Sequence, residues 1–197
     1  YYNEGGNGVI AISMNRLYEF TYKLENGALY TDFIDPHDIY DKVIVIDAGH
    51  GSRMSGATKN GIQEKDINLD IVLQLKALFD AYDGNIGVYY TRTDDSNPTL
   101  QQRAELANKA GADLFISVHN NSSGTGNFTS VNGTQVLYSE SDDRELGSKK
   151  LAQICLDNVT AATGSNDFGL LKADDIYIVR SSEAPVALIE VGFMTNR

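Results

Sequence analysis

From residue 43 onward, short apolar runs alternate with longer segments of helical periodicity, and this alternation restricts the possible folds more than any other feature of the chain. The apolar runs are nearly continuous, which is typical of strands buried on both faces of a sheet. Six strands are expected, at Val43–Asp47, Ile86–Thr91, Leu114–Val118, Thr134–Tyr138, Ile176–Arg180 and Val186–Glu190. Strands that alternate with helices predict an α/β fold, with a mostly parallel central sheet of about six strands and helices on both faces.

Three helices are expected between these strands. The first starts after Glu64, and its apolar positions share one face: Ile71, Val72, Leu75, Leu78, Phe79 and Tyr82. The second begins at Asn97–Pro98, a capping residue followed by a proline in the first turn, and stops at Gly111. The third stops near Gly164 and has these apolar positions: Leu151, Ile154, Cys155 and Val159.

Residues 1–41 have a different pattern. Four apolar residues alternate with polar ones, as in a half-buried strand: Tyr18, Phe20, Tyr22 and Leu24. The Asn26–Gly27 pair that follows is a strong signal for a tight β-hairpin turn. A short hairpin segment cannot bury a core of its own. We therefore expect residues 1–41 to be the end of an upstream β module plus a linker, and residues 42–197 to form the α/β domain.

Charge and cysteine content exclude several classes of protein. With 16 Lys and Arg against 27 Asp and Glu, the net charge is −11, which repels the phosphates of nucleic acids. No apolar run approaches the roughly 20 residues of a membrane-spanning helix. The single cysteine, Cys155, excludes an internal disulfide and a cysteine-based zinc site. We expect no nucleic-acid partner and no transmembrane segment.

Polar side chains follow three of the expected strands at the point where each strand ends. His50 follows the first strand, His119 follows the third, and Glu190 ends the sixth. Because ligands bind outside the carboxyl ends of parallel strands, these residues should meet at one edge of the sheet. Glu64, at the start of the first helix, lies on the segment that returns from the His50 turn.

Two histidines and a carboxylate are a common ligand set for catalytic zinc, which keeps a fourth position for water. A further carboxylate can accept the proton of that water as it attacks a carbonyl. Each residue also has a structural interpretation: His50 can bond to the backbone, and Glu64 is favoured by the helix dipole. Glu190 lies in an apolar run, where a carboxylate is costly to bury unless it is paired or bound. Together, the residues favour a metal site over coincidence.

The remaining charged residues of interest have structural interpretations. Arg92 and Arg103 have two interpretations, ligand binding or pairing with carboxylates such as Asp47, Asp94 or Asp113, and the pairing is favoured. His37, between two aspartates of the linker, is expected to be solvated surface.

Six segments occur in an order that is highly specific when they are taken together. They are VIVIDAGHG (43–51), GIQEKDINLDI (61–71), VYYTRTDD (88–95), LQQRAELAN (100–108), ADLFISVHNNSS (112–123) and APVALIEVGFMTN (184–196). On these segments the chain resembles the zinc-dependent N-acetylmuramoyl-L-alanine amidases of bacterial cell walls. The resemblance covers essentially residues 43–197, as the catalytic domain of that family.

The resemblance implies roles for the matching positions. His50, Glu64 and His119 would bind Zn²⁺, and Glu190 would be the catalytic carboxylate. Asn121 matches an asparagine that follows the second histidine, and is expected to orient the substrate or the loop. The implied substrate is peptidoglycan: the amide between N-acetylmuramic acid and L-alanine of muramyl peptides is hydrolysed, in cell-wall remodelling or lysis. Such an enzyme is expected to act outside the cytoplasm, in the cell envelope or secreted, and no signal peptide is predicted from the sequence given.

Some features depart from the family pattern. Ser52 stands where a second glycine is usual, which alters the turn but none of the reactive groups. The segment between His119 and Glu190 leaves no room for an autoinhibitory helix, so the site is expected to be open. Members of the family continue into a C-terminal helix that packs on the sheet. We expect the sequence given, which ends at Arg197, to lack this helix. An apolar face of the sheet would then be uncovered.

Two other functions stay open on the sequence. A zinc carboxypeptidase acting on the stem peptide would need a cation for the free carboxylate of its substrate, and Arg92 or Arg180 could supply one. A non-catalytic wall-binding module is the second alternative. Retention of Glu190 beside three ligand candidates counts against it, because a binding module has no chemical need for that carboxylate.

Overall fold

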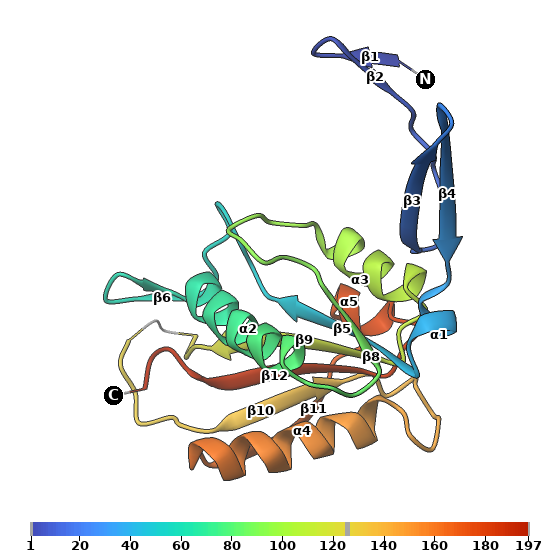
Figure 1. Ribbon diagram of the computed structural model, residues 1–197. Helices are drawn as coiled ribbons and strands as arrows, with labels where there is room; N and C mark the ends of the chain where they lie inside the picture. Colours follow the sequence, from blue (N-terminus) through green and yellow to red (C-terminus); the bar gives the residue numbers. More distant parts are fainter. Residues whose placement is uncertain (1, 125–126, 197) are drawn as a thin grey trace.

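The computed structural model describes residues 2–124 and 127–196, which form an α/β fold preceded by two small hairpins (Figure 1). The strands are β1 (Tyr2–Glu4), β2 (Asn7–Val9), β3 (Glu19–Glu25), β4 (Ala28–Ile34), β5 (Lys42–Ala48), β6 (Thr58–Lys59), β7 (Ile62–Gln63), β8 (Ile86–Tyr90), β9 (Leu114–Asn121), β10 (Thr134–Tyr138), β11 (Asp167–Lys172) and β12 (Val186–Phe193). The helices are α1 (Pro36–Ile39), α2 (Glu64–Asp80), α3 (Leu100–Lys109), α4 (Ser148–Thr163) and α5 (Tyr177–Arg180). None of these helices has the length and apolar character needed to cross a membrane, within the described residues.

The central sheet has six strands in the order β11-β10-β12-β9-β5-β8. Strands β12, β9, β5 and β8 run parallel to one another. Strands β10 and β11 are parallel to each other and run in the opposite direction, since β10 pairs antiparallel with β12. The predicted mostly parallel sheet of about six strands is confirmed, and its direction changes once, between β12 and β10.

Helices cover both faces of the sheet, as the sequence predicts (Figure 1). On one face, Val72 of α2 and Leu156 of α4 are buried against the strands. On the other face, Ala107 of α3 and Ile178 of α5 are buried. Between α2 and α4, Ile116 in the middle of β9 is only half-buried. The expectation that a missing C-terminal helix leaves an apolar face open stays a prediction.

In the central sheet, one predicted strand is wrong and one strand was not predicted. Ile176–Arg180 is predicted as a strand but contains α5, a helix of one turn whose Ile178 and Val179 are buried. A short apolar run does not distinguish a buried strand from a buried helical turn, because periodicity needs greater length to be visible. The sixth strand is instead β11, whose apolar pattern is interrupted by Gly169 at a φ of 89°.

The helices α2 and α4 lie where they are predicted, and α4 ends at Gly164 in the left-handed conformation, with φ 69°. The predicted buried face of α2 is partly wrong, since Leu78 is 69% exposed and Tyr82, beyond the helix end, is 57% exposed. At 3.6 residues per turn, Leu78 lies about 120° around the helix axis from the buried Val72.

The helix α3 begins later than the predicted Asn97–Pro98. Its N-cap is Thr99, whose hydroxyl accepts from the N–H of Gln102 while the Gln102 side chain accepts from the N–H of Thr99. This capping box satisfies two helix-end donors at once, so the helix starts at Leu100.

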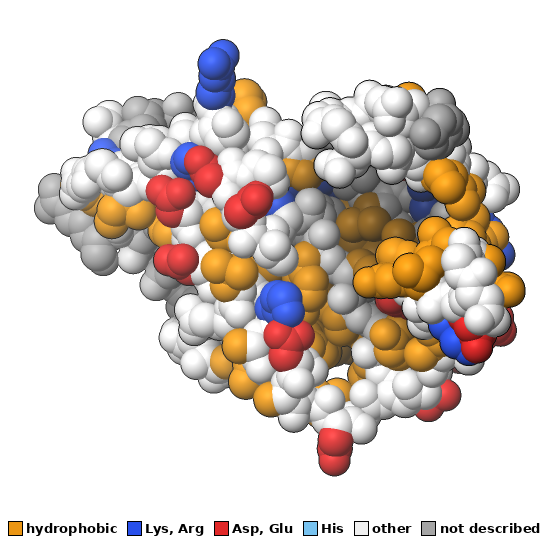
Figure 2. All heavy atoms as spheres, turned by 45° about the horizontal axis from the view of Figure 1, so that its top comes forward, with side chains coloured by type: hydrophobic (Ala, Val, Ile, Leu, Met, Phe, Trp, Pro, Cys, Tyr) orange, Lys and Arg blue, Asp and Glu red, His pale blue; other side chains and the backbone are white. Residues whose placement is uncertain are grey.

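The β3–β4 hairpin turns at Asn26 and Gly27, as predicted. Their φ angles of 51° and 76° are both positive, as a tight two-residue hairpin turn requires. The hairpin projects from the body of the protein, and Figure 2 shows hydrophobic side chains gathered on its side of the molecule. Tyr22 at its centre is 71% exposed. The division into an upstream module and an α/β domain stays a prediction.

The predicted linker is not simply solvated chain. It contains the short helix α1. His37 is exposed, as predicted, and its ring also bonds to the carbonyl of Gly111 at 2.9 Å. At the base of the hairpin, the Tyr89 hydroxyl donates to Glu19 at 2.6 Å. These bonds attach the N-terminal segment to the α/β fold.

Candidate metal centre and catalytic carboxylate

Three parallel strands bring His50, His119 and Glu190 to one edge of the sheet. In the pairing of β12 with β9, Glu190 lies directly beside His119. In the pairing of β5 with β9, Ala48 lies beside Val118, so His50 follows the end of β5 one residue past the level of His119. The convergence expected from the strand ends is therefore present in the structure.

Glu64 completes the group from the first turn of α2. Its Oε1 atom lies 3.2 Å from Nε2 of His50 and 2.9 Å from Nδ1 of His119. One donor atom from each of the three residues lies within 4.8 Å of the others. The two imidazole rings stand nearly perpendicular, at 78°, with their centroids 4.9 Å apart. Two nitrogens and an oxygen thus converge on a single point.

The Glu64 carboxylate is held in place and kept ionised. Its Oε2 accepts from the N–H of Ala57 at 2.8 Å, and its Oε1 accepts from the N–H of Asn120 at 3.1 Å. Burial alone would raise the pKa of Glu64, but hydrogen bonds with His119, His50 and Ala57 bring it well below its usual range. Burial would lower the pKa of His119, and its hydrogen bond to Glu64 outweighs this and raises it.

Two glycines of the site are required because neighbouring side chains lie too close to their Cα atoms to leave room for a Cβ atom. A Cβ atom at Gly49 would lie 2.2 Å from the ring of His119, so any larger residue would displace that histidine. A Cβ atom at Gly56 would lie 2.3 Å from Oε2 of Glu64. His50 itself has φ 62°, a conformation that is uncommon outside glycine and needs support from its surroundings.

Arg103 supplies part of that support. Its guanidinium has five N–H donors. They form hydrogen bonds with the side-chain oxygens of Asp47 and Asn97 and with the backbone carbonyls of Ala48, His50 and Pro98. The ion pair with Asp47 is buried, since the two side chains are 3% and 1% exposed. The predicted structural pairing of Arg103 with a carboxylate is confirmed, and the same side chain fixes the carbonyl of His50.

Arg92 fixes the other side of the turn, but the prediction that it pairs with a carboxylate is wrong. It donates to four backbone carbonyls instead, those of Ala48, Gly49, Lys65 and Asp94. Sequence reasoning could not assign these acceptors, because they depend on the conformation of the turn.

Asn68 is a member of the site that the sequence analysis did not single out. It is fully buried, donates to the carbonyl of Gly49 at 3.1 Å and accepts from the side chain of Asn120 at 2.9 Å. The available signal was its spacing of four residues from Glu64, which places both on one face of α2.

Glu190 differs from every other polar group of the site. Its Oε2 atom is buried, yet has no hydrogen-bond partner among the described residues. Burial raises the pKa of Glu190, and the nearby His119 and His50 only partly oppose this. A buried acceptor without a partner is costly, so its retention points to a ligand that comes to it.

Asn121 lies at the end of β9, where its side-chain oxygen accepts from the N–H of Ser122 at 2.8 Å. Its backbone carbonyl accepts from the N–H of Met194 at 2.7 Å. The segment that leads from β9 to β10 begins here, and its residues 125–126 lie outside the described part of the chain.

A sequence model of the N-acetylmuramoyl-L-alanine amidase family matches residues 44–197. N-acetylmuramoyl-L-alanine amidase LytC of Bacillus subtilis is 35% identical over 158 residues, which cover 80% of this chain and 30% of LytC. The endolysin of Bacillus phage SPP1 is 35% identical over 158 residues, covering 79% of this chain and 56% of the endolysin. The chain thus spans less than two thirds of the length of these two curated relatives.

Solved structures of N-acetylmuramoyl-L-alanine amidases are also similar to this chain. The catalytic domain of CwlV, an N-acetylmuramoyl-L-alanine amidase from Bacillus (Paenibacillus) polymyxa var. colistinus, is 35% identical and superposes with a TM-score of 0.70, covering 79% of this chain and 82% of that one. The N-acetylmuramoyl-L-alanine amidase from Clostridium difficile 630 is 33% identical with a TM-score of 0.70, covering 79% of this chain and 81% of that one.

Proposed function

The chain belongs to the N-acetylmuramoyl-L-alanine amidase family, and on this premise we propose that it hydrolyses the amide between N-acetylmuramic acid and L-alanine in peptidoglycan. One observation carries the proposal beyond family membership. The donor atoms of His50, Glu64 and His119 converge, and the unpaired oxygen of Glu190 lies beside them.

The three converging residues fit a zinc ion. Two imidazole nitrogens and a carboxylate oxygen are a typical ligand set of catalytic zinc, and here the three donor atoms lie within 4.8 Å of one another. We assign His50, Glu64 and His119 as ligands of Zn²⁺. When bound, zinc supplies Lewis-acid chemistry, polarising a carbonyl group and making water more acidic.

Glu190 is the general base and acid of the proposed reaction. Its Oε2 atom accepts a proton from the attacking water as the new C–O bond forms at the lactyl carbonyl carbon. It then returns the proton to the amide nitrogen as the C–N bond breaks, which leaves a lactyl carboxylate and a free L-alanine amine. The raised pKa of Glu190 suits both steps, because a proton carrier works best when its pKa lies near the working pH.

Asn121 is proposed to orient the substrate at the rim of the site. Its side-chain oxygen is engaged with Ser122, so the contact to the substrate would come from its amide nitrogen.

The place of action is also a proposal. The similar proteins include a phage endolysin and a cell wall amidase of Bacillus anthracis. We propose that this chain acts outside the cytoplasm, in the cell envelope or as a secreted protein, because its substrate polymer is located there.

Mass spectrometry of the products tests the proposed function. A defined muramyl peptide is incubated with zinc-loaded protein, beside an EDTA-treated control. We expect an intact stem peptide with a free L-alanine amine, only when metal is present. Release of a C-terminal amino acid instead would assign a carboxypeptidase, and no cleavage with zinc bound would leave a binding module.

The structure weighs against the carboxypeptidase. Arg92 is 3% exposed and donates to four carbonyls, so it has little capacity to bind a substrate carboxylate. Arg180 donates to the carbonyl of Asp175 and lies over the ring of Tyr177. Two surface hollows adjoin the metal centre, and Arg180 is not among the described residues that line them.

A further inference from the structure

Two hollows adjoin the proposed metal centre, and they differ in charge. The first, the α3-side hollow, is about 330 Å³ and lies between the His50 turn and the start of α3. The second, the hairpin-side hollow, is about 370 Å³ and lies between the β6–β7 hairpin and the end of β12. The first contacts the centre through both histidines, and the second through Asn120, whose N–H bonds to Glu64.

The α3-side hollow offers no charge to a ligand apart from the two histidines. Its exposed walls include Met54 and Leu100, and Ile178 lies deep within it. Asp47 and Arg103 also line it, but they neutralise each other as a buried ion pair. All five N–H donors of Arg103 already have acceptors within the protein. Zinc-bound histidines are neutral, so this hollow suits an uncharged group with apolar faces.

The hairpin-side hollow carries a positive charge. Lys59 is the only charged residue that lines it within the described part of the chain, and its ammonium lies 4.2 Å from the centroid of the Phe128 ring. The other residues that line it are uncharged and include three asparagines and the apolar Ile62 and Phe193. The absence of a carboxylate from these described walls is notable in a chain with a net charge of −11.

The substrate has the same asymmetry. On one side of the scissile amide is an N-acetylated sugar, which is uncharged, with apolar ring faces. On the other side is a peptide, and any peptide with a free C-terminus carries at least one carboxylate. Placing that carboxylate beside Lys59 gains a charge–charge attraction, whereas placing it in the α3-side hollow would desolvate it without a partner.

We propose that the α3-side hollow binds the N-acetylmuramoyl sugar and that the hairpin-side hollow binds the stem peptide, with Lys59 facing a peptide carboxylate. This inference rests on the proposed function, because it assumes that the two halves of the substrate meet at the metal centre. It assigns a direction to the substrate across the edge of the sheet.

The test compares three ligands on zinc-loaded protein carrying Glu190→Gln, which holds them uncleaved. They are N-acetylmuramoyl-L-alanyl-D-glutamate, the same compound with both glutamate carboxyls amidated, and lactoyl-L-alanyl-D-glutamate, which lacks the sugar. Dissociation constants are measured by calorimetry in this background and after adding Lys59→Met or Leu100→Ala. Methionine keeps the apolar stem of the lysine without its charge, and alanine is tolerated at the first position of a helix.

We expect Lys59→Met to weaken binding of the two carboxylate ligands about threefold and to leave the amidated ligand unchanged. We expect Leu100→Ala to weaken binding of the two sugar-bearing ligands about threefold and to leave the sugar-free ligand unchanged. The matched controls are Lys149→Met and Leu78→Ala, since neither residue lines either hollow and Leu78 is 69% exposed. Both should leave all three dissociation constants unchanged.

The opposite pattern would overturn the proposal. In that pattern, Lys59→Met weakens binding only of the ligands that carry the sugar, and Leu100→Ala weakens binding only of the ligands that carry free carboxylates. Equal effects on all three ligands, or no binding of any ligand, would also overturn it. Hydrolysis by the unsubstituted protein is measured separately. A protein that binds with the expected pattern but does not cleave would refute the proposed function and leave the orientation supported.

Discussion

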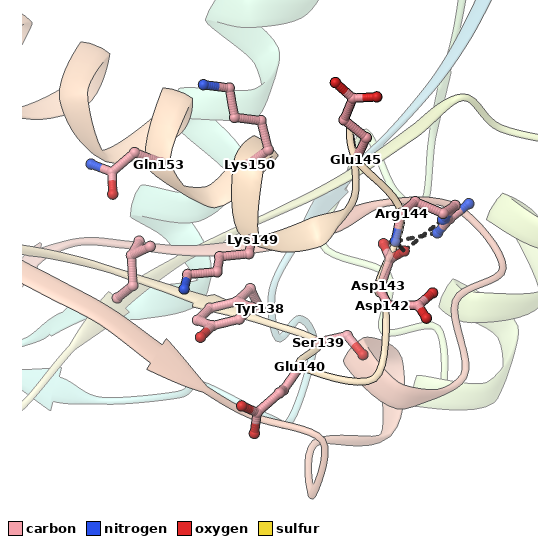
Figure 3. A pocket seen from close by; sticks show the side chains of 11 residues that line it. Tyr138, Ser139, Glu140, Asp142, Asp143, Arg144, Glu145, Lys149, Lys150 and Gln153 are labelled. Carbon is pink, nitrogen blue, oxygen red and sulfur yellow. Dashed lines mark hydrogen bonds and ion pairs between the residues drawn. The ribbon is translucent and has the colours of Figure 1, made fainter.

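The two edges of the central sheet both hold buried carboxylates, but they treat them in opposite ways. At the edge where β12 ends, Oε2 of Glu190 has no partner among the described residues, and burial raises the pKa of Glu190. At the other edge, beside Tyr138 where β10 ends, Asp142 accepts hydrogen bonds from Arg144 (Figure 3). It also accepts hydrogen bonds from the N–H and the hydroxyl of Ser148. Burial alone would raise the pKa of Asp142, but these bonds lower it to about 2.

The difference separates structure from function. Asp142 finds its partners within six residues along the chain, and they tie the loop before α4 to the start of that helix. Glu190 sits beside a histidine that comes from another strand, and one of its oxygens stays unused. A satisfied buried carboxylate stabilises the fold, whereas an unsatisfied one costs stability and is kept for a ligand or a reaction.

The largest expected effect is that of Glu190→Gln. This residue lies at the edge of the sheet where β5, β9 and β12 end, which we call the carboxyl edge. Removal of a general base should lower kcat by about 10²- to 10⁴-fold, while zinc stays bound, because Glu190 is not an assigned ligand. The thermal midpoint should stay the same or rise, since no hydrogen bond of Oε2 is lost. Steady-state kinetics, zinc content and calorimetry measure these quantities. Undiminished turnover would show that the base is another residue.

The next largest effect is on stability, for Arg103→Met. This change leaves the buried Asp47 carboxylate without its counter-charge, which should cost about 3–5 kcal/mol of unfolding free energy. The matched control is Arg144→Met at the opposite edge, where the arginine is half-exposed and its loss should cost about 1 kcal/mol or less. Urea denaturation compares the two, and equal losses would mean that the Asp47–Arg103 pair has no special role in holding the turn.

A smaller effect is expected for Gly49→Ala, measured as zinc affinity. The added methyl would lie 2.2 Å from the ring of His119, which must then move away from its assigned position. Displacing a ligand in this way should weaken zinc binding by about 10- to 100-fold. In the control Gly84→Ala, the methyl would lie 2.1 Å from the ring of Tyr82, which is 57% exposed and free to turn aside. Unchanged affinity in both variants would contradict the account.

The smallest effect is expected for Asp142→Asn, and it depends on pH. The folded-state pKa of Asp142 is lowered from 3.8 to about 2, so its ionised form contributes stability that is present above pH 4. That contribution is lost as the pH falls toward 2. At neutral pH the variant should therefore be less stable by about 1 kcal/mol. The gap should close between pH 4 and pH 2, with activity per folded molecule unchanged. A gap that persists at pH 2 would assign the loss to packing.

The sequence predicts the carboxyl edge better than the rest of the sheet, for a physical reason. His50, His119 and Glu190 each end a long apolar strand, and parallel strands must bring their ends together. The direction of β10 leaves no such signal, because an apolar run reads the same in either direction. The short run that forms α5 was predicted as a strand for lack of visible periodicity.

The support of the site was less predictable than the site itself. Arg92 donates to four backbone carbonyls, of which those of Ala48 and Gly49 lie at the turn, and Asn68 donates to the carbonyl of Gly49. Which carbonyls point inward depends on the conformation of the turn, where His50, Gly51 and Ser52 have positive φ angles. Carboxylate partners such as Asp47 can be anticipated from charge, but carbonyl partners cannot. The sequence therefore predicts which groups react and gives little indication of what holds them.

The central claim is that the carboxyl edge holds one zinc ion with three protein ligands and leaves Glu190 outside the ligand set. A crystal structure of the zinc-loaded protein, with anomalous data collected at the zinc edge, tests this most directly. We expect a single peak with one atom each of His50, Glu64 and His119 at about 2.0–2.2 Å, and with Oε2 of Glu190 uncoordinated. A peak elsewhere, a peak that includes Glu190 as a ligand, or no peak after loading would contradict the account.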